Sequence, residues 1–454
     1  MEYILMHKDI KVLKIKLTAN NLIESIVDIY DFNHLPFSTG IDIKTNHKAF
    51  STWWSDRSIP LARDDYSTIQ SVLPGDDSFS LVVKAHALSL DDQYWIRQED
   101  ENISYDDISF FTNKFNDDIG NIIVGIKENG IVNYYSPDST SNGNLKKRWK
   151  IINGKKYLLK AGSKPNQYEI FNEIIASKVM DLLNIEHVDY EFVIDHGHIY
   201  CASQNFVSYN EDFVTAYQLK CSKSKANHIS LYDHLLSICK SLKIPNCKEK
   251  INQMLLVDYI LGNTDRHFNN FGVIRDAKTL EFLRMAPIYD TGSCLGYDLN
   301  DEELNKSLNC DWKPFQSQKI KTQLDLIDDY SWLDFNALKI VPREIYKSLE
   351  SFSKYISPSR RNLIVDYVVR KINYLYNQLG ISEQIKFNSE ELSILEKMII
   401  DYLKNHNGEL LELDSLMKET GNAYITIYRA ISKLVEKGLI KRVGSRKTGY
   451  WVLL

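Results

Sequence analysis

The amino-acid sequence predicts an α+β fold divided into several domains. At 454 residues the chain is too long for one ordinary core, because a domain usually takes roughly 150 residues. Strand-like segments gather from residue 121 onward, helical spacing dominates after Phe206, and a short basic segment closes the chain. We therefore expect four parts: an N-terminal α+β subdomain over residues 1–120, followed by residues 121–215, 216–382 and 388–454.

Composition and charge are those of an ordinary globular protein. Hydrophobic residues make up 44% of the chain and charged residues 25%, close to the globular average. The sequence has no run of about 18 apolar residues, and Met1 to Lys16 alternate charged and apolar residues where a signal peptide has an apolar core. We therefore expect a cytoplasmic protein without a membrane partner. The net charge of −5 makes no whole-chain case for nucleic acid.

The cysteines and a tryptophan pair are expected to serve structure rather than chemistry. Trp53 and Trp54 are predicted to anchor a compact turn in the core. No cysteine has CxxC spacing, so neither a disulfide framework nor a thiolate zinc site is indicated. Reduced, mostly buried thiols are expected at Cys201, Cys221, Cys239, Cys247, Cys294 and Cys310.

Between residues 121 and 215 the pattern predicts a small antiparallel sheet and one long helix. Apolar segments there alternate with turns that contain Gly or Asn. The predicted strands are Asn121–Ile126, Ile131–Tyr135, Trp149–Ile152 and Lys156–Lys160, followed by a helix over Tyr168–Leu183 and a hairpin of Tyr190–Ile194 with Ile199–Ala202. Farther along, helices are predicted over Leu231–Leu242, Lys250–Leu261 and Arg360–Leu379.

The stretch after Leu261 has the spacing that is most informative about chemistry. Asp265 and Asn270 lie five residues apart, directly after an apolar helix that Gly262 is expected to terminate. In kinase loops an Asp accepts or orients the proton of the acceptor hydroxyl, and an Asn at this spacing turns back to bind magnesium. Asp265 is therefore the candidate catalytic residue and Asn270 a candidate metal ligand.

A second candidate metal ligand, Asp290, follows a predicted hairpin formed by Phe271–Ile274 and Leu280–Leu283. It opens the turn Asp290-Thr291-Gly292. This arrangement resembles the metal-binding Asp of kinases, because a magnesium ion that bridges phosphates needs hard oxygen ligands.

Phosphate binding also needs a cation and a carboxylate that holds the cation in place. Lys160 ends a predicted strand, and Glu173 lies on the helix that follows. Ahead of them, a turn with the hydroxyl of Ser141, with Gly143 and with two lysines is suited to covering phosphates. Each feature alone is commonplace, and it is their order along the chain that predicts phosphotransfer.

These motifs resemble the HipA-like serine/threonine kinase family. The resemblance spans roughly residues 137–292 and is carried by three stretches: Asn263–His267 with Asn270–Gly272, Ala286–Ser293, and Asn172–Ala176 through Leu183–Ile185. It implies a two-lobed, protein-kinase-like fold, ATP with magnesium as cofactors, and transfer to Ser or Thr of a protein substrate.

The resemblance also implies regulation. Some members of this family are bacterial toxins, so a toxin of a toxin–antitoxin or defence system, with an antitoxin-like protein partner, is expected. The family commonly carries an autophosphorylated hydroxyl in its phosphate-covering loop, and Ser141 or Thr140 occupies the matching place. Only Gly143 remains of a Gly-rich turn, so the sequence leaves open which hydroxyl is modified.

The sequence Asp290-Thr291-Gly292-Ser293 is also the aspartic-protease signature, in which two carboxylates share a proton. That chemistry needs a second Asp-Thr-Gly or Asp-Ser-Gly, and the sequence contains neither. A symmetric dimer would supply one but would leave Asp265 and Asn270 unexplained.

Histidines offer two further alternatives. His196 and His198 with Cys201 suggest a metal site, but they lie on a predicted hairpin turn without a fourth ligand nearby. His267 is expected to brace its loop through a hydrogen bond rather than to accept a proton.

Residues 388–454 resemble a winged helix-turn-helix domain. The predicted elements are Leu392–Lys404, Glu412–Thr420, Tyr424–Lys437, Leu439–Val443 and Gly449–Leu453. From Arg429 onward basic residues far outnumber acidic ones, which suits contacts to phosphates beside a recognition helix. The candidate contacts to duplex DNA are Tyr424, Thr426, Arg429, Arg446 and Lys447. Protein binding by the same domain is the alternative.

The sequence thus predicts an ATP- and magnesium-dependent serine/threonine protein kinase. Two alternatives stay open: a DNA-binding transcriptional regulator whose kinase fold only senses nucleotide, and a small-molecule kinase. A module that only binds nucleotide has no chemical need for the full set of phosphotransfer residues, which argues for catalytic activity. This set consists of Lys160, Glu173, Asp265, Asn270 and Asp290. The acceptor cannot be deduced from these motifs.

Overall fold

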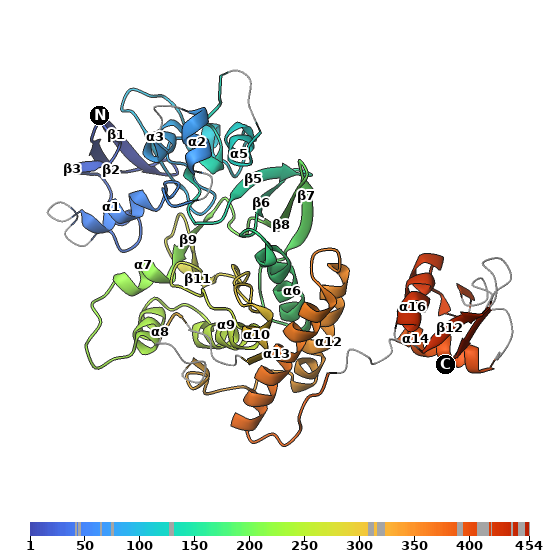
Figure 1. Ribbon diagram of the computed structural model, residues 1–454. Helices are drawn as coiled ribbons and strands as arrows, with labels where there is room; N and C mark the ends of the chain where they lie inside the picture. Colours follow the sequence, from blue (N-terminus) through green and yellow to red (C-terminus); the bar gives the residue numbers. More distant parts are fainter. Residues whose placement is uncertain are drawn as a thin grey trace. The chain divides into compact units, whose positions relative to one another are not determined.

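The structure is a computed structural model with two compact units, Met1–Ile385 and Lys386–Leu454, which are described separately. Both units combine helices with small antiparallel sheets (Figure 1), so the predicted α+β class is confirmed. No helix that the structure describes is long and apolar enough to span a bilayer. The described residues are 1–40, 43, 47–63, 66–73, 77–126, 131–306, 313–315, 323–387, 394–405, 417–418, 420–436, 439–443 and 450–453.

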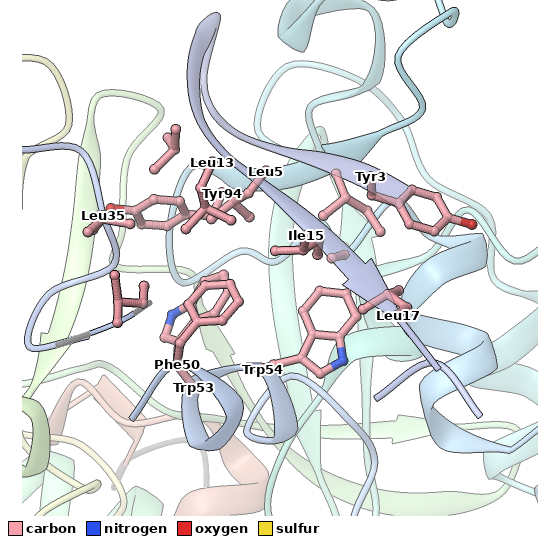
Figure 2. Close-up of a cluster of buried hydrophobic side chains, with 14 of the residues drawn as sticks. Tyr3, Leu5, Leu13, Ile15, Leu17, Leu35, Phe50, Trp53, Trp54 and Tyr94 are labelled. Atoms are coloured by element: carbon pink, nitrogen blue, oxygen red, sulfur yellow. The ribbon is translucent and has the colours of Figure 1, made fainter. Parts of the chain in front are cut away.

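The first unit begins with a four-stranded antiparallel sheet of order β3-β2-β1-β4. Its strands are β1 Glu2–His7, β2 Ile10–Leu17, β3 Ile23–Ile29 and β4 Tyr94–Arg97. Alternating apolar residues turn one face toward α1 (Lys48–Ser55), where Trp53 and Trp54 pack against side chains such as Leu5 and Leu13 (Figure 2). The tryptophan pair is therefore core, as predicted, although it lies on a helix rather than in a turn.

Residues 121–126 do not form the strand that was predicted. They begin inside helix α5, where Ile119, Ile122 and Ile123 recur at helical spacing and are buried in one cluster. The apolar run satisfied a strand pattern, but its burial on one helical face decided the structure. Residues 131–135 likewise lie in none of the described strands. After α1, the helices α2 Tyr66–Val72 and α3 Ser78–Lys84 precede β4. Between β4 and the next sheet lie α4 Tyr105–Ile108, α5 Asp118–Ile123 and the 3-10 helix η1 Pro137–Thr140.

The second sheet has the order β5-β6-β8-β7 and is antiparallel throughout. Its strands are β5 Lys147–Ile152, β6 Lys155–Lys160, β7 Glu191–Asp195 and β8 His198–Gln204. Helix α6 (Tyr168–Leu182) connects β6 to β7, as predicted, and its residues pack against β7 and β8. The register sets Lys147 directly opposite Lys160.

A third sheet, of order β11-β10-β9, leads into the helical part of the unit. The strands are β9 Glu211–Thr215, β10 Gly272–Asp276 and β11 Phe282–Met285, and the helices are α7 Ala216–Cys221, α8 Leu231–Ser241, α9 Cys247–Leu261, α10 Asp301–Lys306, α12 Phe335–Ser351 and α13 Pro358–Gln378. Gly262 ends α9 with φ of 70°, as predicted, and a Cβ there would lie 2.2 Å from the Tyr367 hydroxyl.

A buried ion cluster joins the first sheet to the third. The Asp212 carboxylate on β9 pairs with Nε of Arg275 at 3.0 Å and with Nε2 of His7 at 3.1 Å. The His7 ring stacks on Tyr94 with centroids 4.2 Å apart, and its Nδ1 lies 2.8 Å from Nδ1 of His34. Burial alone would raise the pKa of Asp212, but His7 and Arg275 hold it well below its ordinary value.

The second unit contains α14 Ile394–Asn405, α16 Tyr424–Glu436, β12 Ile440–Val443 and β13 Tyr450–Leu453. The two helices and the antiparallel β12-β13 pair share a hydrophobic core that includes Leu403, Ile427 and Leu434. The helix predicted over Glu412–Thr420 lies mostly outside the described residues.

Candidate active site

Lys160 lies where a strand, a helix and the segment after β11 meet. Its Nζ is 2.6 Å from Oδ1 of Asp290 and 3.5 Å from Oε1 of Glu173 on α6. Burial alone would lower the pKa of Lys160, but Asp290, Tyr190 and Glu173 together raise it well above its ordinary value. Three predicted residues that are far apart in the sequence are therefore in contact, and the lysine is a permanent cation.

The Asp290 turn is held in an uncommon backbone conformation. Asp290 has φ of 58°, a left-handed geometry that costs an ordinary residue about 1–2 kcal/mol. Its N–H donates to the Tyr190 hydroxyl at 3.3 Å, and the N–H of Thr291 donates to Oε2 of Glu173 at 2.9 Å. Burial would raise the pKa of the Asp290 carboxyl, but Lys160 holds it well below its ordinary value. The turn thus presents a permanent carboxylate.

The backbone after Asp290 docks directly on α6. The Asn172 side-chain amide donates to the carbonyl oxygens of Gly292, at 3.1 Å, and Cys294, at 2.6 Å. A Cβ on Gly292 would lie 3.1 Å from the Glu169 carbonyl oxygen, so the close approach favours glycine. This contact explains why Asn172 and Glu173 occur side by side: one residue holds the turn and the other faces Lys160.

Arg266 is the buried centre of the loop between α9 and β10, residues 262–271, here called the Asp265 loop. Its Nε and Nη2 donate to the two oxygens of Asp258 at 2.8 and 2.9 Å. Its Nη1 donates to the carbonyl oxygen of Asn270, at 2.9 Å, and to that of Tyr289. One guanidinium therefore fixes the Asp265 loop beside the Asp290 turn. Sequence reasoning missed this role, although a carboxylate inside the apolar α9 was a signal.

The Asp265 loop is shaped by side-chain amides. Asn263 donates to Oδ1 of Asp258 at 2.8 Å and accepts from the N–H of Asp265 at 3.2 Å. The Asn270 amide nitrogen donates to the backbone carbonyl of Asp265 at 3.1 Å, so its carboxamide oxygen is the atom left for a ligand. The Asp265 side chain is half exposed and pairs with Lys313, whose Nζ is 2.8 Å from Oδ1.

His267 is adjacent to these groups without contributing a charge. Its Nδ1 accepts from the N–H of Asn269 at 3.3 Å. Burial lowers the pKa of His267 below its ordinary value, so the ring is neutral at pH 7. The bracing hydrogen bond that was predicted is present.

A second lysine faces the same space as Lys160. Lys147 is its direct neighbour across the β5-β6 pair, and burial followed by the charge of Lys160 lowers the pKa of Lys147 to about 8. A Cβ on Gly143, which has φ of 100°, would lie 2.4 Å from the Lys147 ammonium nitrogen. Two ammonium groups under a glycine turn make a cradle for an anion. Sequence reasoning had named Lys147 only as part of the turn.

The candidate modified hydroxyls lie in buried positions. Oγ1 of Thr140 donates to the Leu88 carbonyl oxygen at 2.6 Å. Oγ of Ser141 donates to the Asp138 carbonyl oxygen at 3.2 Å and accepts from Arg63 at 3.1 Å. Both side chains are tied into the protein, and Ser141 and Gly143 belong to the turn that covers Lys147.

Among the described residues, His196, His198 and Cys201 do not form a group with metal-ligand spacing. The Asp290 carboxylate pairs with Lys160, whereas an aspartic protease needs a second carboxylic acid there. The hairpin turn predicted around His196 is present, with left-handed conformations at His196 and Gly197. The His196 ring pairs with Asp195 at 3.2 Å.

In the second unit, Tyr424, Thr426 and Arg429 are all exposed on α16. The rings of Tyr424 and Tyr428 stack with centroids 6.3 Å apart. Arg446 and Lys447 lie outside the described residues.

Comparison with known proteins adds a family match. Residues 141–354 match the family model described as the HipA-like C-terminal domain. A curated relative is the serine/threonine-protein kinase CtkA of Helicobacter pylori, which is 26% identical over 174 residues, 35% of this chain and 53% of the relative. The chain thus spans about half the length of that relative.

Two solved structures are also similar. The Helicobacter pylori proinflammatory kinase CtkA has a TM-score of 0.42 and 20% identity, covering 54% of this chain and 94% of the other. The Shewanella oneidensis toxin–antitoxin complex of HipA, HipB and operator DNA has a TM-score of 0.47 and 13% identity, covering 83% of this chain and 97% of the other.

Proposed function

Because residues 141–354 match the HipA-like C-terminal domain family, we propose that the protein is an ATP- and magnesium-dependent serine/threonine protein kinase. The observation that supports this most is the contact of Lys160 with both Glu173 and Asp290. A strand lysine held by a helix carboxylate, next to a carboxylate on a turn, is the arrangement that phosphate positioning requires. The curated kinase relative supports the same class of reaction.

The donor atoms fit a nucleotide with magnesium. Asp290 would supply a carboxylate oxygen and Asn270 its carboxamide oxygen, and hard oxygen donors are the ligands that magnesium prefers. Arg266 brings these two residues together by donating to the carbonyls of Asn270 and Tyr289. Lys160 and Lys147 would bind phosphate oxygens beneath Gly143. Magnesium, when bound, neutralises charge on the phosphates.

In the proposed reaction the acceptor hydroxyl oxygen attacks the γ-phosphorus, and the bond from that phosphorus to the bridging oxygen of ADP breaks. Asp265 takes the hydroxyl proton, which its half-exposed position permits. Lys160 holds the phosphates in line, which supplies much of the rate because phosphoryl transfer depends on positioning and charge.

Autophosphorylation at Thr140 or Ser141 forms part of the proposal. Both hydroxyls are engaged with carbonyl oxygens inside the protein. Either one must leave its present partners to receive a phosphate, and the turn that carries Gly143 must move with it. We therefore expect modification to be slow and to weaken nucleotide binding.

We further propose that the second unit binds duplex DNA and that an antitoxin-like protein restrains a toxin activity. The DNA proposal is supported by exposed Arg429 and Thr426 on α16. Fluorescence anisotropy of the full chain with random duplex at low salt tests it. Binding that R429A weakens is expected, and no binding would exclude it.

The experiment for the kinase is incubation with γ-labelled ATP and magnesium. We compare wild type with Asp265→Ala, Asp290→Ala and the control Asp189→Ala, an exposed residue outside the site. Wild type and control should label themselves or lysate proteins, whereas each of the two site variants should lose about 10²–10³-fold of the transfer rate. Equal labelling by all four proteins would exclude the mechanism. Nucleotide binding without any labelling would favour the nucleotide-sensing regulator instead.

A further inference from the structure

The acceptor end of the site contains an ion pair that the proposed mechanism has not used. Among the described residues, Asp265 has one charged partner, Lys313, with Nζ 2.8 Å from Oδ1. The two residues are 48 positions apart in the sequence. The Lys313 side chain is 55% exposed and that of Asp265 is 47% exposed. Both side chains are therefore accessible to an acceptor hydroxyl and to the phosphoryl group that it receives.

Lys313 reaches Asp265 from an anchored position. Two residues farther on, Phe315 is buried and makes edge-on contacts with Tyr232 of α8 and with Phe268 and Phe271 of the Asp265 loop. The ring centroids are 5.3, 5.7 and 6.1 Å apart, respectively, within the range of favourable aromatic pairs. Phe315 therefore packs on the same loop that carries Asp265, and this anchor distinguishes the pair from a chance surface contact.

Two other cations of the proposed site, Arg266 and Lys160, have partners other than Asp265. Arg266 is saturated by Asp258 and by two backbone carbonyls. The Nδ1 of His267 accepts from the N–H of Asn269 at 3.3 Å, so that ring is engaged within its own loop. Lys160 is held at the nucleotide end by Asp290 and Glu173. Lys313 thus contacts Asp265, and Asp265 is the residue to which the acceptor hydroxyl is expected to bind.

We propose that Lys313 is a catalytic residue that rests on Asp265 until an acceptor hydroxyl takes its place there, and then contacts the phosphoryl group in transfer. The inference rests on the proposed kinase function. The acceptor oxygen bonds to the γ-phosphorus, its proton passes to Asp265, and the bond to the ADP oxygen breaks. Lys313 stays protonated and forms no covalent bond. Its charge stabilises the three phosphoryl oxygens, over which negative charge is spread in the transition state.

The test compares Lys313→Met and Lys313→Arg with a matched control, Lys248→Met. Lys248 also forms an ion pair with an aspartate, Asp328, and its side chain is 52% exposed, so it matches Lys313 in charge, pairing and exposure. The full chain is incubated with magnesium and γ-labelled ATP. The readouts are the single-turnover rate of phosphate incorporation into the chain itself and into dephosphorylated casein, and the Kd values for ADP and for ADP with aluminium fluoride, a mimic of the phosphoryl group in transfer.

We expect Lys313→Met to lower the transfer rate about 10²–10³-fold, the usual effect of removing one preorganised charge partner of the transition state. The transfer rate of Lys313→Arg, which keeps the charge, should remain within about tenfold of the wild-type rate. The transfer rate of Lys248→Met should equal that of wild type. Lys313→Met should weaken binding of ADP with aluminium fluoride but leave the Kd for ADP unchanged, which a merely structural role would not do.

The outcomes separate the two proposals. If wild type transfers phosphate and Lys313→Met transfers it equally fast or faster, Lys313 is not catalytic, whereas the kinase function stands. If Lys313→Met weakens ADP binding as much as it slows transfer, the residue is structural and the inference fails. If wild type itself transfers no phosphate, the kinase function fails and the role of Lys313 falls with it.

Discussion

The proposed nucleotide end and the proposed acceptor end of the site are built in opposite ways. At the nucleotide end, Lys160, Glu173 and the Arg266–Asp258 pair are buried. At the acceptor end, Asp265 and Lys313 form one half-exposed pair. An unpaired buried charge costs several kcal/mol, whereas an exposed pair contributes little and exchanges readily. If the proposed kinase function holds, the phosphates would be bound by groups fixed before an acceptor arrives, and the exposed pair would be free to adapt to the acceptor.

Breaking the buried Arg266–Asp258 ion pair should have the largest effect on the free energy of unfolding. Arg266→Met leaves Asp258 charged and unpaired in the interior, so we expect the free energy of unfolding to fall by about 3–5 kcal/mol. Arg284→Met, which breaks a more exposed pair with Glu211, should cost less than about 1 kcal/mol. Urea unfolding followed by tryptophan fluorescence measures both. Similar losses for the two variants would contradict the contrast.

A methyl group in the phosphate cradle should affect binding more than folding. Gly143→Ala places a Cβ 2.4 Å from the Lys147 ammonium nitrogen, so Lys147 must move, and we expect the Kd for ATP to rise about tenfold, a loss of roughly 1.4 kcal/mol. Gly154→Ala is the matched control, because Gly154 also has positive φ but nothing lies within 4 Å of its Cβ position. Isothermal titration with ATP should show no change for this control. A tenfold loss in both variants would assign the effect to backbone strain alone.

Proton uptake should report on Lys147 directly. Burial and Lys160 lower its pKa to about 8 in the ATP-free protein, and bound phosphates favour the protonated form and so raise that pKa. ATP affinity should therefore fall as pH rises through 8, and binding at pH 8 should take up roughly half a proton. Titration in two buffers with different ionisation enthalpies measures the uptake. Lys147→Met should abolish it, and uptake that persists in this variant would mean that another group titrates.

The smallest effect on stability is expected at the proposed acceptor end. Lys313→Met removes one half-exposed pair, and the free energy of unfolding should change by less than about 1 kcal/mol. Thermal unfolding of this variant beside Lys248→Met checks the value. A loss as large as that of Arg266→Met would show that the acceptor end is a structural element after all.

The sequence could predict that Lys160, Glu173 and Asp290 belong together because phosphotransfer chemistry limits residue types and their order, whereas nucleotide binding by these residues stays a prediction. A lysine on a strand, a glutamate on the next helix and an Asp-Thr-Gly after a hairpin are each visible locally, and the structure brings Lys160, Glu173 and Asp290 into contact. Asn172 was visible only as part of a family motif, because its partner carbonyls at Gly292 and Cys294 lie at a distant point of the chain.

Two features could not be predicted from the sequence, because each depends on how distant parts of the chain pack together. The contact of Lys313 with Asp265 depends on where Phe315 packs, which no local period encodes. The apolar run in residues 121–126 fits a strand as well as a helix, and only the surrounding core decides in favour of α5. The described helices and β-pair of the second unit match the predicted elements, whereas its role in DNA binding stays a prediction.

The ion cluster of His7, Asp212 and Arg275 makes the third sheet depend on the first for part of its buried charge pairing. A recombination event that removed the first sheet would leave the Asp212–Arg275 pair without its histidine and without the Tyr94 hydroxyl that accepts from Arg275. A chain cut between the first sheet and β9 is therefore expected to lose stability in the third sheet, because Asp212 and Arg275 would lose buried partners. Lys386 to Leu454, by contrast, form a compact unit with a hydrophobic core of their own.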